Sequence, residues 1–198
     1  MLALRERGEI LDLVLGNVVL LSSAALETER AFGRLAAEGL VASGASPCVV
    51  VGGLGFGSTL RGVLDIMPAD GRVLVVEKLN AVVDVARAEA AHLVQGALDD
   101  PRVELLTADV ADVIASAKGV AAVLLDVDNG PEWASFRTNA RLYADAALVR
   151  TREALAPRGI FAVWSGYPAD PFVARLRRAG FAARIEPLLE RGVCGAAA

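Results

Sequence analysis

The chain alternates short apolar runs with segments in which apolar residues recur every three or four positions. Runs of this length suit strands buried on both faces, and the helical spacing suits helices that cover them. The predicted strands are CVVVGG (48–53), RVLVVE (72–77), RVELLTAD (102–109), GVAAVLLDVD (119–128), GIFAVWS (159–165) and FAARIEPLLE (181–190). The predicted helices span 58–67, 80–94, 110–117, 142–155 and 170–180. This alternation predicts a Rossmann-like, doubly wound α/β fold with a mainly parallel sheet.

The pattern differs before the first of these strands. Two apolar runs flank Gly16-Asn17 between Ile10 and Ala25, and this predicts a β-hairpin. Asp12 and the Gly-Asn pair interrupt the segment, which argues against the apolar core of a signal peptide. Helical spacing then continues as far as Gly44. We predict that residues 1–44 form a hairpin-and-helix appendage packed on a nucleoside-binding α/β domain of residues 45–198, as one compact unit.

Composition and charge restrict the partners. The formal net charge of −4 argues against nucleic acid as the main partner. No run reaches the roughly 18–20 uninterrupted apolar residues of a membrane span. The two cysteines stand in no metal-ligand spacing, and His92 is the single histidine. We therefore expect a cytoplasmic protein with a small-molecule ligand, no membrane partner and no metal.

The candidate site follows from the strand ends, because doubly wound sheets bind ligands at the carboxyl ends of their strands. A glycine turn at 53–57 follows the first strand and allows close approach to the backbone. Glu77 ends the second strand, placed to accept hydrogen bonds from ribose hydroxyls, and Asp109 and Asp126 end the next two. The candidate cofactor-binding residues are Gly53, Leu54, Gly55, Phe56, Gly57, Glu77, Lys78, Asp109, Val110 and Asp126.

The type of nucleotide follows from what the turn lacks. The dinucleotide pattern G-x-G-x-x-G fails at Ser58, and no Gly-Lys-Ser/Thr phosphate loop is present. The acids at 77, 109 and 126 repel a polyphosphate but tolerate a cationic sulfonium nucleoside. The alternative is a Rossmann-type sheet with a degenerate site.

Several segments resemble a short spermidine-synthase-like group of bacterial proteins within the class I S-adenosylmethionine-dependent methyltransferase superfamily. They are GGLGFGSTLRGVL, VVEKLNAVVDVAR, DPRVELLTADVADVI, LLDVDNGP, RLYADAALVRTREALAPRGIFAVWS and LRRAGF, and the resemblance covers about residues 20–181. It implies a class I methyltransferase-type core, S-adenosylmethionine or decarboxylated S-adenosylmethionine as cofactor, N-terminal β-structure and a homodimer. It also implies that Glu77 binds the ribose and Asp109 the adenine.

The motifs specific to polyamine synthases match less well. Asp126 matches the first acid of their D-x-x-D-P motif, which helps deprotonate the attacking amine. The second acid aligns with Asn129, although Asp128 is adjacent. The acid of their glycine turn, which binds the aminopropyl ammonium, aligns with Phe56. Loss of such a charge partner typically costs a few kcal/mol, which argues against aminopropyl transfer.

Three functions stay open at this point. The first is an S-adenosylmethionine-dependent methyltransferase acting on a small acceptor such as an amine, because a methyl donor does not need the ammonium-binding acid. The second is an aminopropyltransferase, and the third is a non-catalytic nucleoside-binding or assembly protein. Asp126 and Asp128 are the candidate catalytic bases. The alternative for Asp126 is a strand-end acid that orders the following loop through backbone amides. Asn129 and Tyr143 are candidate substrate-binding residues. The alternatives are that Asn129 only forms a turn and that Tyr143 packs in the core beneath a helix.

Two further features are left open by the sequence. Trp133, Phe136 and Trp164 are candidate walls of the acceptor pocket, with core packing as the default for each. After Glu190 only RGVCGAAA remains, which is short for the seventh, antiparallel strand usual in the superfamily. Either that strand is missing or a partner covers the exposed edge.

Overall fold

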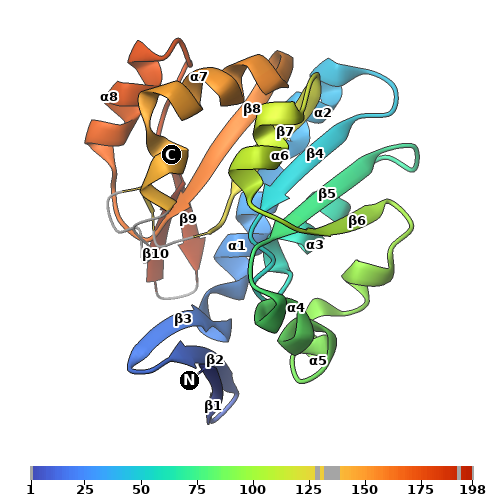
Figure 1. Cartoon of the computed structure of the whole chain (residues 1–198), viewed down its shortest axis with the longest axis vertical. Helices are drawn as coiled ribbons and strands as arrows, with labels where there is room; N and C mark the ends of the chain where they lie inside the picture. The colour runs from blue at the N-terminus through green and yellow to red at the C-terminus, as the bar shows by residue number, and fades with distance from the viewer. Residues whose placement is uncertain (1, 128–129, 132–138, 191–192, 198) are drawn as a thin grey trace.

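The central sheet carries the predicted doubly wound fold (Figure 1). The computed structural model describes residues 2–127, 130–131, 139–190 and 193–197. Across these residues the sheet has seven strands in the order β6-β5-β4-β7-β8-β10-β9. They are β4 (Cys48–Gly52), β5 (Arg72–Glu77), β6 (Val103–Thr107), β7 (Val120–Leu125), β8 (Leu155–Ser165), β9 (Glu186–Glu190) and β10 (Val193–Ala197). Strands β4 to β8 pair in parallel, and β10 is antiparallel to both of its neighbours. The Rossmann-like fold class is confirmed.

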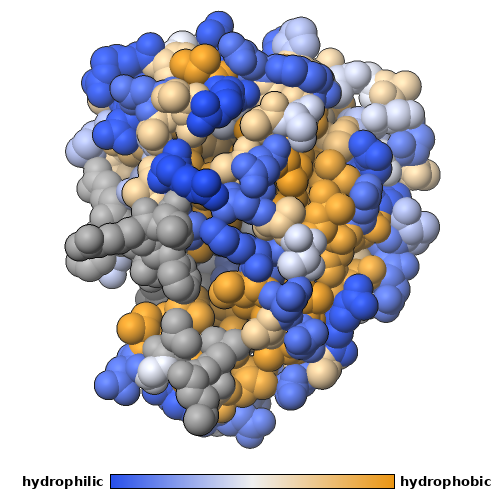
Figure 2. Space-filling model, viewed as in Figure 1, coloured by the Kyte–Doolittle hydropathy of each residue, from blue (hydrophilic) through white to orange (hydrophobic). Residues whose placement is uncertain are grey.

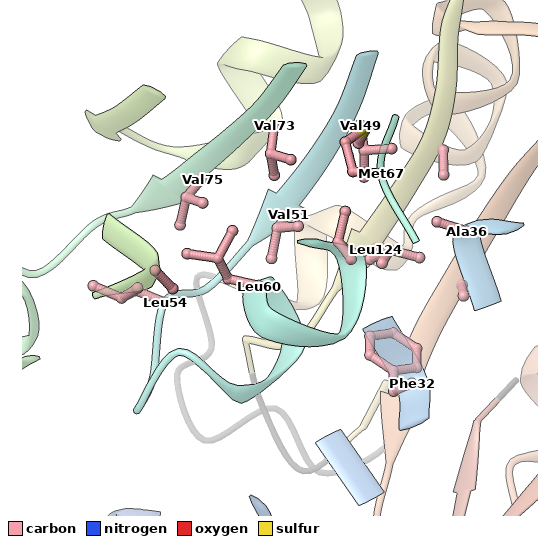
Figure 3. Close-up of a cluster of buried hydrophobic side chains, with 14 of the residues drawn as sticks. Phe32, Ala36, Val49, Val51, Leu54, Leu60, Met67, Val73, Val75 and Leu124 are labelled. Atoms are coloured by element: carbon pink, nitrogen blue, oxygen red, sulfur yellow. The ribbon is translucent and has the colours of Figure 1, made fainter. Parts of the chain in front are cut away.

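Helices cover both faces of this sheet. The first face packs against α1 (Leu26–Gly33), α2 (Ala37–Ser43), α3 (Ser58–Leu64), α4 (Asn80–Arg87) and α5 (Ala91–Val94). The second packs against α6 (Val110–Ser116), α7 (Asp145–Ala154) and α8 (Asp170–Arg178). In Figure 3, Val51 of β4 points toward Leu60 of α3 and Val49 lies beside Met67, whereas Val50 belongs to the core cluster on the second face of the sheet. The apolar runs are continuous because both faces of each strand are buried.

The N-terminal segment forms a separate antiparallel sheet. Its strands are β1 (Leu2–Arg7), β2 (Ile10–Leu15) and β3 (Val18–Ser22). The predicted hairpin at Gly16-Asn17 is confirmed, whereas β1 was not predicted, because its charged residues hide the strand pattern. The carboxylate of Asp12 is buried and accepts hydrogen bonds from Arg5, Arg7 and Ser22. Hydrogen bonds from Arg7 and Arg5 hold the pKa of Asp12 well below its usual range.

The glycine turn packs against this small sheet. Phe56 is buried with Leu11 of β2 and with Ala90, which lies between α4 and α5. The single helix predicted over 80–94 is wrong, because the chain leaves the helix after Arg87 and re-enters it at Ala91. The periodicity continues through the break, but tertiary packing places Ala90 in the small cluster instead.

The C-terminal part differs in detail from the prediction. Helix α7 begins at Asp145, and β8 begins at Leu155, so that Pro157 lies inside the strand. Of the predicted strand 181–190, only Glu186–Glu190 is extended. The seventh strand does form: β10 pairs with β9 along its length, and its Ala196 pairs with Ser165 of β8. Main-chain hydrogen bonds between strands need no large side chains, and an Ala- and Gly-rich segment can therefore form this strand. Within the described residues, no helix combines the length and apolar character required to cross a membrane.

Candidate functional site

The carboxyl ends of β4, β5, β6 and β7 open into a pocket of about 380 Å³. Strand β3 of the N-terminal sheet supplies another wall. Figure 2 shows hydrophobic residues on this face where the N-terminal sheet meets the rest of the molecule. The predicted cofactor-binding residues that line the pocket are Gly53, Gly55, Glu77, Lys78, Asp109, Val110 and Asp126. The strand ends therefore converge as the fold rule requires.

Gly53 lets two of these strand ends approach closely. Its φ is +91°, and a Cβ at this position would overlap the main-chain oxygen of Asp126. Gly53 N–H donates to Val76 O at 2.9 Å, and Asp126 N–H donates to Gly52 O at 2.8 Å. The chain after β4 is thus tied to β5 on one side and to β7 on the other. Only glycine fits this backbone without displacing it.

Glu77 fixes the glycine turn as well as facing the pocket. One carboxylate oxygen accepts from Leu54 N–H at 3.0 Å, and the other accepts from Leu79 N–H at 2.8 Å. The residue is only 8% exposed. Each carboxylate oxygen has a second lone pair, so two ribose hydroxyls can still be accepted. Leu54 itself is buried and lies outside the pocket lining among the described residues.

Asp109 is bound by two cations. One oxygen caps α6 by accepting from Ala111 N–H at 3.0 Å. The other accepts from Lys78 Nζ at 2.9 Å and pairs with Arg141 of the short 3-10 helix η4 (Asn139–Tyr143). Burial opposes ionisation, but the hydrogen bonds from Lys78 and Ala111 and the charge of Arg141 outweigh it and lower the pKa. An adenine amino group here would share Asp109 with both cations. The sequence did not predict the pairing of Asp109 with Lys78 and Arg141.

Asp126 lines the pocket and is hydrogen-bonded to a threonine of α3. Its Oδ2 accepts from Thr59 Oγ1 at 2.6 Å, and Thr59 is 2% exposed at the start of α3. Burial raises the pKa of Asp126 to about 6, although the Thr59 hydrogen bond lowers it. A carboxylate with a pKa near neutrality suits a general base. Sequence reasoning missed Thr59, because the two residues are 67 positions apart and nothing local marks the pairing.

Other predicted site residues lie elsewhere. Phe56 is 2% exposed in the small N-terminal cluster, and Gly57 precedes α3 outside the pocket lining. Tyr143 lies in the core, where its ring meets that of Phe172 edge-on with 5.5 Å between the ring centroids. This agrees with the core-packing alternative given for Tyr143. Trp164 does line the pocket. Asp128, Asn129, Trp133 and Phe136 lie outside the described residues, and the roles assigned to them stay predictions.

Some lining residues carried no signal in the sequence. Val19 to Ser22 of β3 and Glu29 of α1 belong to the segment predicted as an appendage, yet they form a wall of the pocket. In the described part of the chain, no three or more His, Cys, Asp or Glu side chains are grouped to hold a metal ion. A metal-free site stays a prediction.

Comparison with known proteins places this geometry in a fold group. Neither a protein family nor a curated protein matches the sequence. A spermidine synthase from Thermotoga maritima matches the structure with a TM-score of 0.77 and 16% identity, over 99% of this chain and 67% of that chain. A spermidine synthase solved with the transition-state analogue AdoDATO gives 0.76 and 16%, over 99% and 66%. Human methyltransferase-like protein 13, solved with SAH, gives 0.65 and 21%, over 86% and 80%.

These comparisons define the class of the fold. The chain has the class I methyltransferase-type fold that spermidine synthases share, and the resemblance seen in the sequence is confirmed at this level. It spans about two thirds of the length of the two spermidine synthase chains. Similarity at these identities concerns the fold and leaves the reaction to be argued from the pocket.

Proposed function

We propose that this chain is an S-adenosylmethionine-dependent transferase that methylates a small, amine-bearing acceptor. The observation that carries the proposal is that Gly53, Glu77, Asp109 and Asp126 line one pocket from adjacent strand ends. The similarity to structures solved with SAH and AdoDATO supports the cofactor class. A homodimer and a cytoplasmic location stay expectations.

The residues present fit an adenosyl sulfonium. Glu77 keeps lone pairs for the ribose, Asp109 lines the pocket and could share an oxygen between its present partners and the adenine amino group, and Gly53 permits close contact with the backbone. When bound, S-adenosylmethionine supplies an electrophilic methyl carbon and retains the electron pair of the carbon–sulfur bond as that bond breaks. The acidic lining tolerates the sulfonium charge.

The protein's own contribution is positioning and proton transfer. The pocket holds the amine and the methyl carbon together, which can supply several kcal/mol of the rate enhancement. The amine nitrogen forms the new bond to carbon, and its proton passes to the carboxylate of Asp126. With a pKa of about 6, Asp126 is ionised at neutral pH and basic enough to accept that proton. Trp164 and β3 form further walls of the pocket.

Calorimetric titration tests the cofactor class. We expect S-adenosylmethionine and S-adenosylhomocysteine to bind, and NAD not to bind. Glu77→Ala should weaken binding by about 100-fold, because two hydrogen bonds to a buried carboxylate are lost. Glu104→Ala is the matched control, since Glu104 lies on the neighbouring strand with its side chain 53% exposed. Circular dichroism checks that the Glu77 variant folds. Absence of binding by every adenosyl sulfur nucleoside would refute the proposal.

The same titration, together with a turnover assay, separates the other functions. Preference for decarboxylated S-adenosylmethionine would select aminopropyl transfer. Against that function stands Phe56, whose side chain is buried where a polyamine synthase has its ammonium-binding acid. Binding without release of S-adenosylhomocysteine across a panel of primary amines would select a non-catalytic protein.

A further inference from the structure

The Thr59 hydroxyl lies between two hydrogen-bond acceptors, one on the segment after β7 and one in α1. Its oxygen is 2.6 Å from Asp126 Oδ2, beyond the end of β7, and 3.3 Å from the main-chain oxygen of Glu29 in α1. A hydroxyl has one hydrogen to donate and lone pairs to accept. It therefore donates to one of these oxygens at a time. The shorter distance and the negative charge select Asp126 while that carboxylate is ionised.

The close packing of α1 on α3 holds the second acceptor in place. A Cβ on Gly62 of α3 would overlap the main-chain oxygen of Arg30, and a Cβ on Gly33 of α1 would overlap that of Thr59. The two helix backbones thus approach more closely than ordinary side chains permit. This contact brings the Glu29 carbonyl within 3.3 Å of Thr59 Oγ1.

We propose that Thr59 is a positioning residue that stabilises Asp126 before and after it takes a proton. While Asp126 is ionised, the Thr59 O–H donates to its carboxylate. Once Asp126 has accepted a proton, its own O–H donates to Thr59 Oγ1, and the Thr59 O–H turns to the Glu29 carbonyl. No proton is gained or lost by Thr59 in this exchange. Its use in catalysis rests on the proposed function, in which the acceptor amine supplies the proton.

Other charged groups line the same pocket as Asp126. Among the described residues these are Glu29 of α1, Glu77 at the end of β5, and the Lys78–Asp109 pair beyond it. The two causes that set the pKa of Asp126 are its burial and the Thr59 hydrogen bond, and substitution of Thr59 by valine removes none of these charged side chains. A change in the titration of Asp126 on removal of the Thr59 hydroxyl therefore reports the hydrogen bond itself.

The test measures the pKa of Asp126 by NMR. The full-length protein is labelled with ¹³C at the aspartate carboxyl carbons, and the Asp126 signal is recorded as a function of pH without cofactor. We expect Thr59→Val to raise the pKa of Asp126 by about one unit, because the hydrogen bond to the charged form is the stronger of the two. Thr59→Ser should restore the wild-type titration, because it keeps the hydroxyl. Thr151→Val is the matched control, since Thr151 is also 2% exposed but donates to Ala147 O in α7.

The outcomes separate this inference from the proposed function. A wild-type titration of Asp126 in Thr59→Val, or a valine-like titration in Thr59→Ser, would overturn it. Thr59→Ala replaces the valine variant if circular dichroism shows that valine is not accommodated. In turnover, Thr59→Val should shift the acid limb of the kcat profile to higher pH with unchanged affinity for S-adenosylhomocysteine. Failure of every adenosyl nucleoside to bind would remove the transferase proposal, while the titration would still decide the hydrogen bond.

Discussion

Replacement of Asp126 by asparagine should stabilise the protein at neutral and alkaline pH. Burial raises the pKa of Asp126 from its ordinary 3.8 to about 6. The folded state therefore binds a proton more tightly than the unfolded chain does. The associated stability is fully present below the unfolded pKa and is lost as the pH rises through the folded pKa. Asparagine has the same shape, can still accept from Thr59, and carries no charge to desolvate.

The size of this effect follows from the pKa change. Each pKa unit corresponds to about 1.4 kcal/mol, so ionised Asp126 lowers the free energy of unfolding by about 3 kcal/mol at pH 8. Near pH 4 the carboxyl is almost fully protonated in the folded state, and most of the penalty is removed. We expect Asp126→Asn to exceed the wild type by about 3 kcal/mol at pH 8 and to differ much less at pH 4.

Urea denaturation of both proteins at the two pH values measures this difference. The comparison cancels every titrating group except Asp126, provided that the two proteins unfold in one cooperative step. Asp65→Asn serves as a control of opposite sign, because hydrogen bonds from Arg30 and Arg34 lower the pKa of Asp65 to about 2. That variant should lose stability at pH 8. A difference between Asp126→Asn and the wild type that does not change with pH would refute the reasoning.

Two further substitutions test the packing around the site. Phe56→Asp, which introduces the acid found in polyamine synthases, should cost about 3–5 kcal/mol in urea denaturation, because Phe56 is 2% exposed. Phe56→Leu is the apolar control, and wild-type stability of the aspartate variant would contradict the packing described. Gly62→Ala should cost about 1–3 kcal/mol, because the new methyl group meets the Arg30 main chain. Gly166→Ala should be nearly neutral, since its nearest contact, with Trp164, is an ordinary 3.6 Å; equal losses in both alanine variants would count against the helix contact.

The strand ends were predictable because they depend on a local signal and a general rule. Apolar runs gave β4 to β8, and parallel strands bring Glu77, Asp109 and Asp126 to the same edge wherever their chain segments lie. The glycine turn was likewise visible, because Gly53 has a conformational requirement that other residues do not meet.

The remainder depends on contacts between distant segments. Thr59 has no local feature that marks it as the partner of Asp126, and Arg141 has none that marks it as the partner of Asp109. Phe56 belongs to the glycine turn in sequence, but its side chain packs with Leu11 of the N-terminal sheet in a separate cluster. Such pairings are set by tertiary packing and leave no periodic trace in the sequence.

The N-terminal sheet has a consequence for any molecule that binds in the pocket. Residues Val19 to Ser22 line the pocket, while Leu11 holds the same sheet against Phe56 in the glycine turn. A molecule that contacts both walls binds only when the sheet is docked. The free-energy cost of docking the sheet therefore makes the binding of this molecule weaker. By reciprocity, the bound molecule stabilises the docked sheet against local opening. For such a molecule, residues 2–22 are a thermodynamically coupled part of the binding site, although they lie outside the α/β core.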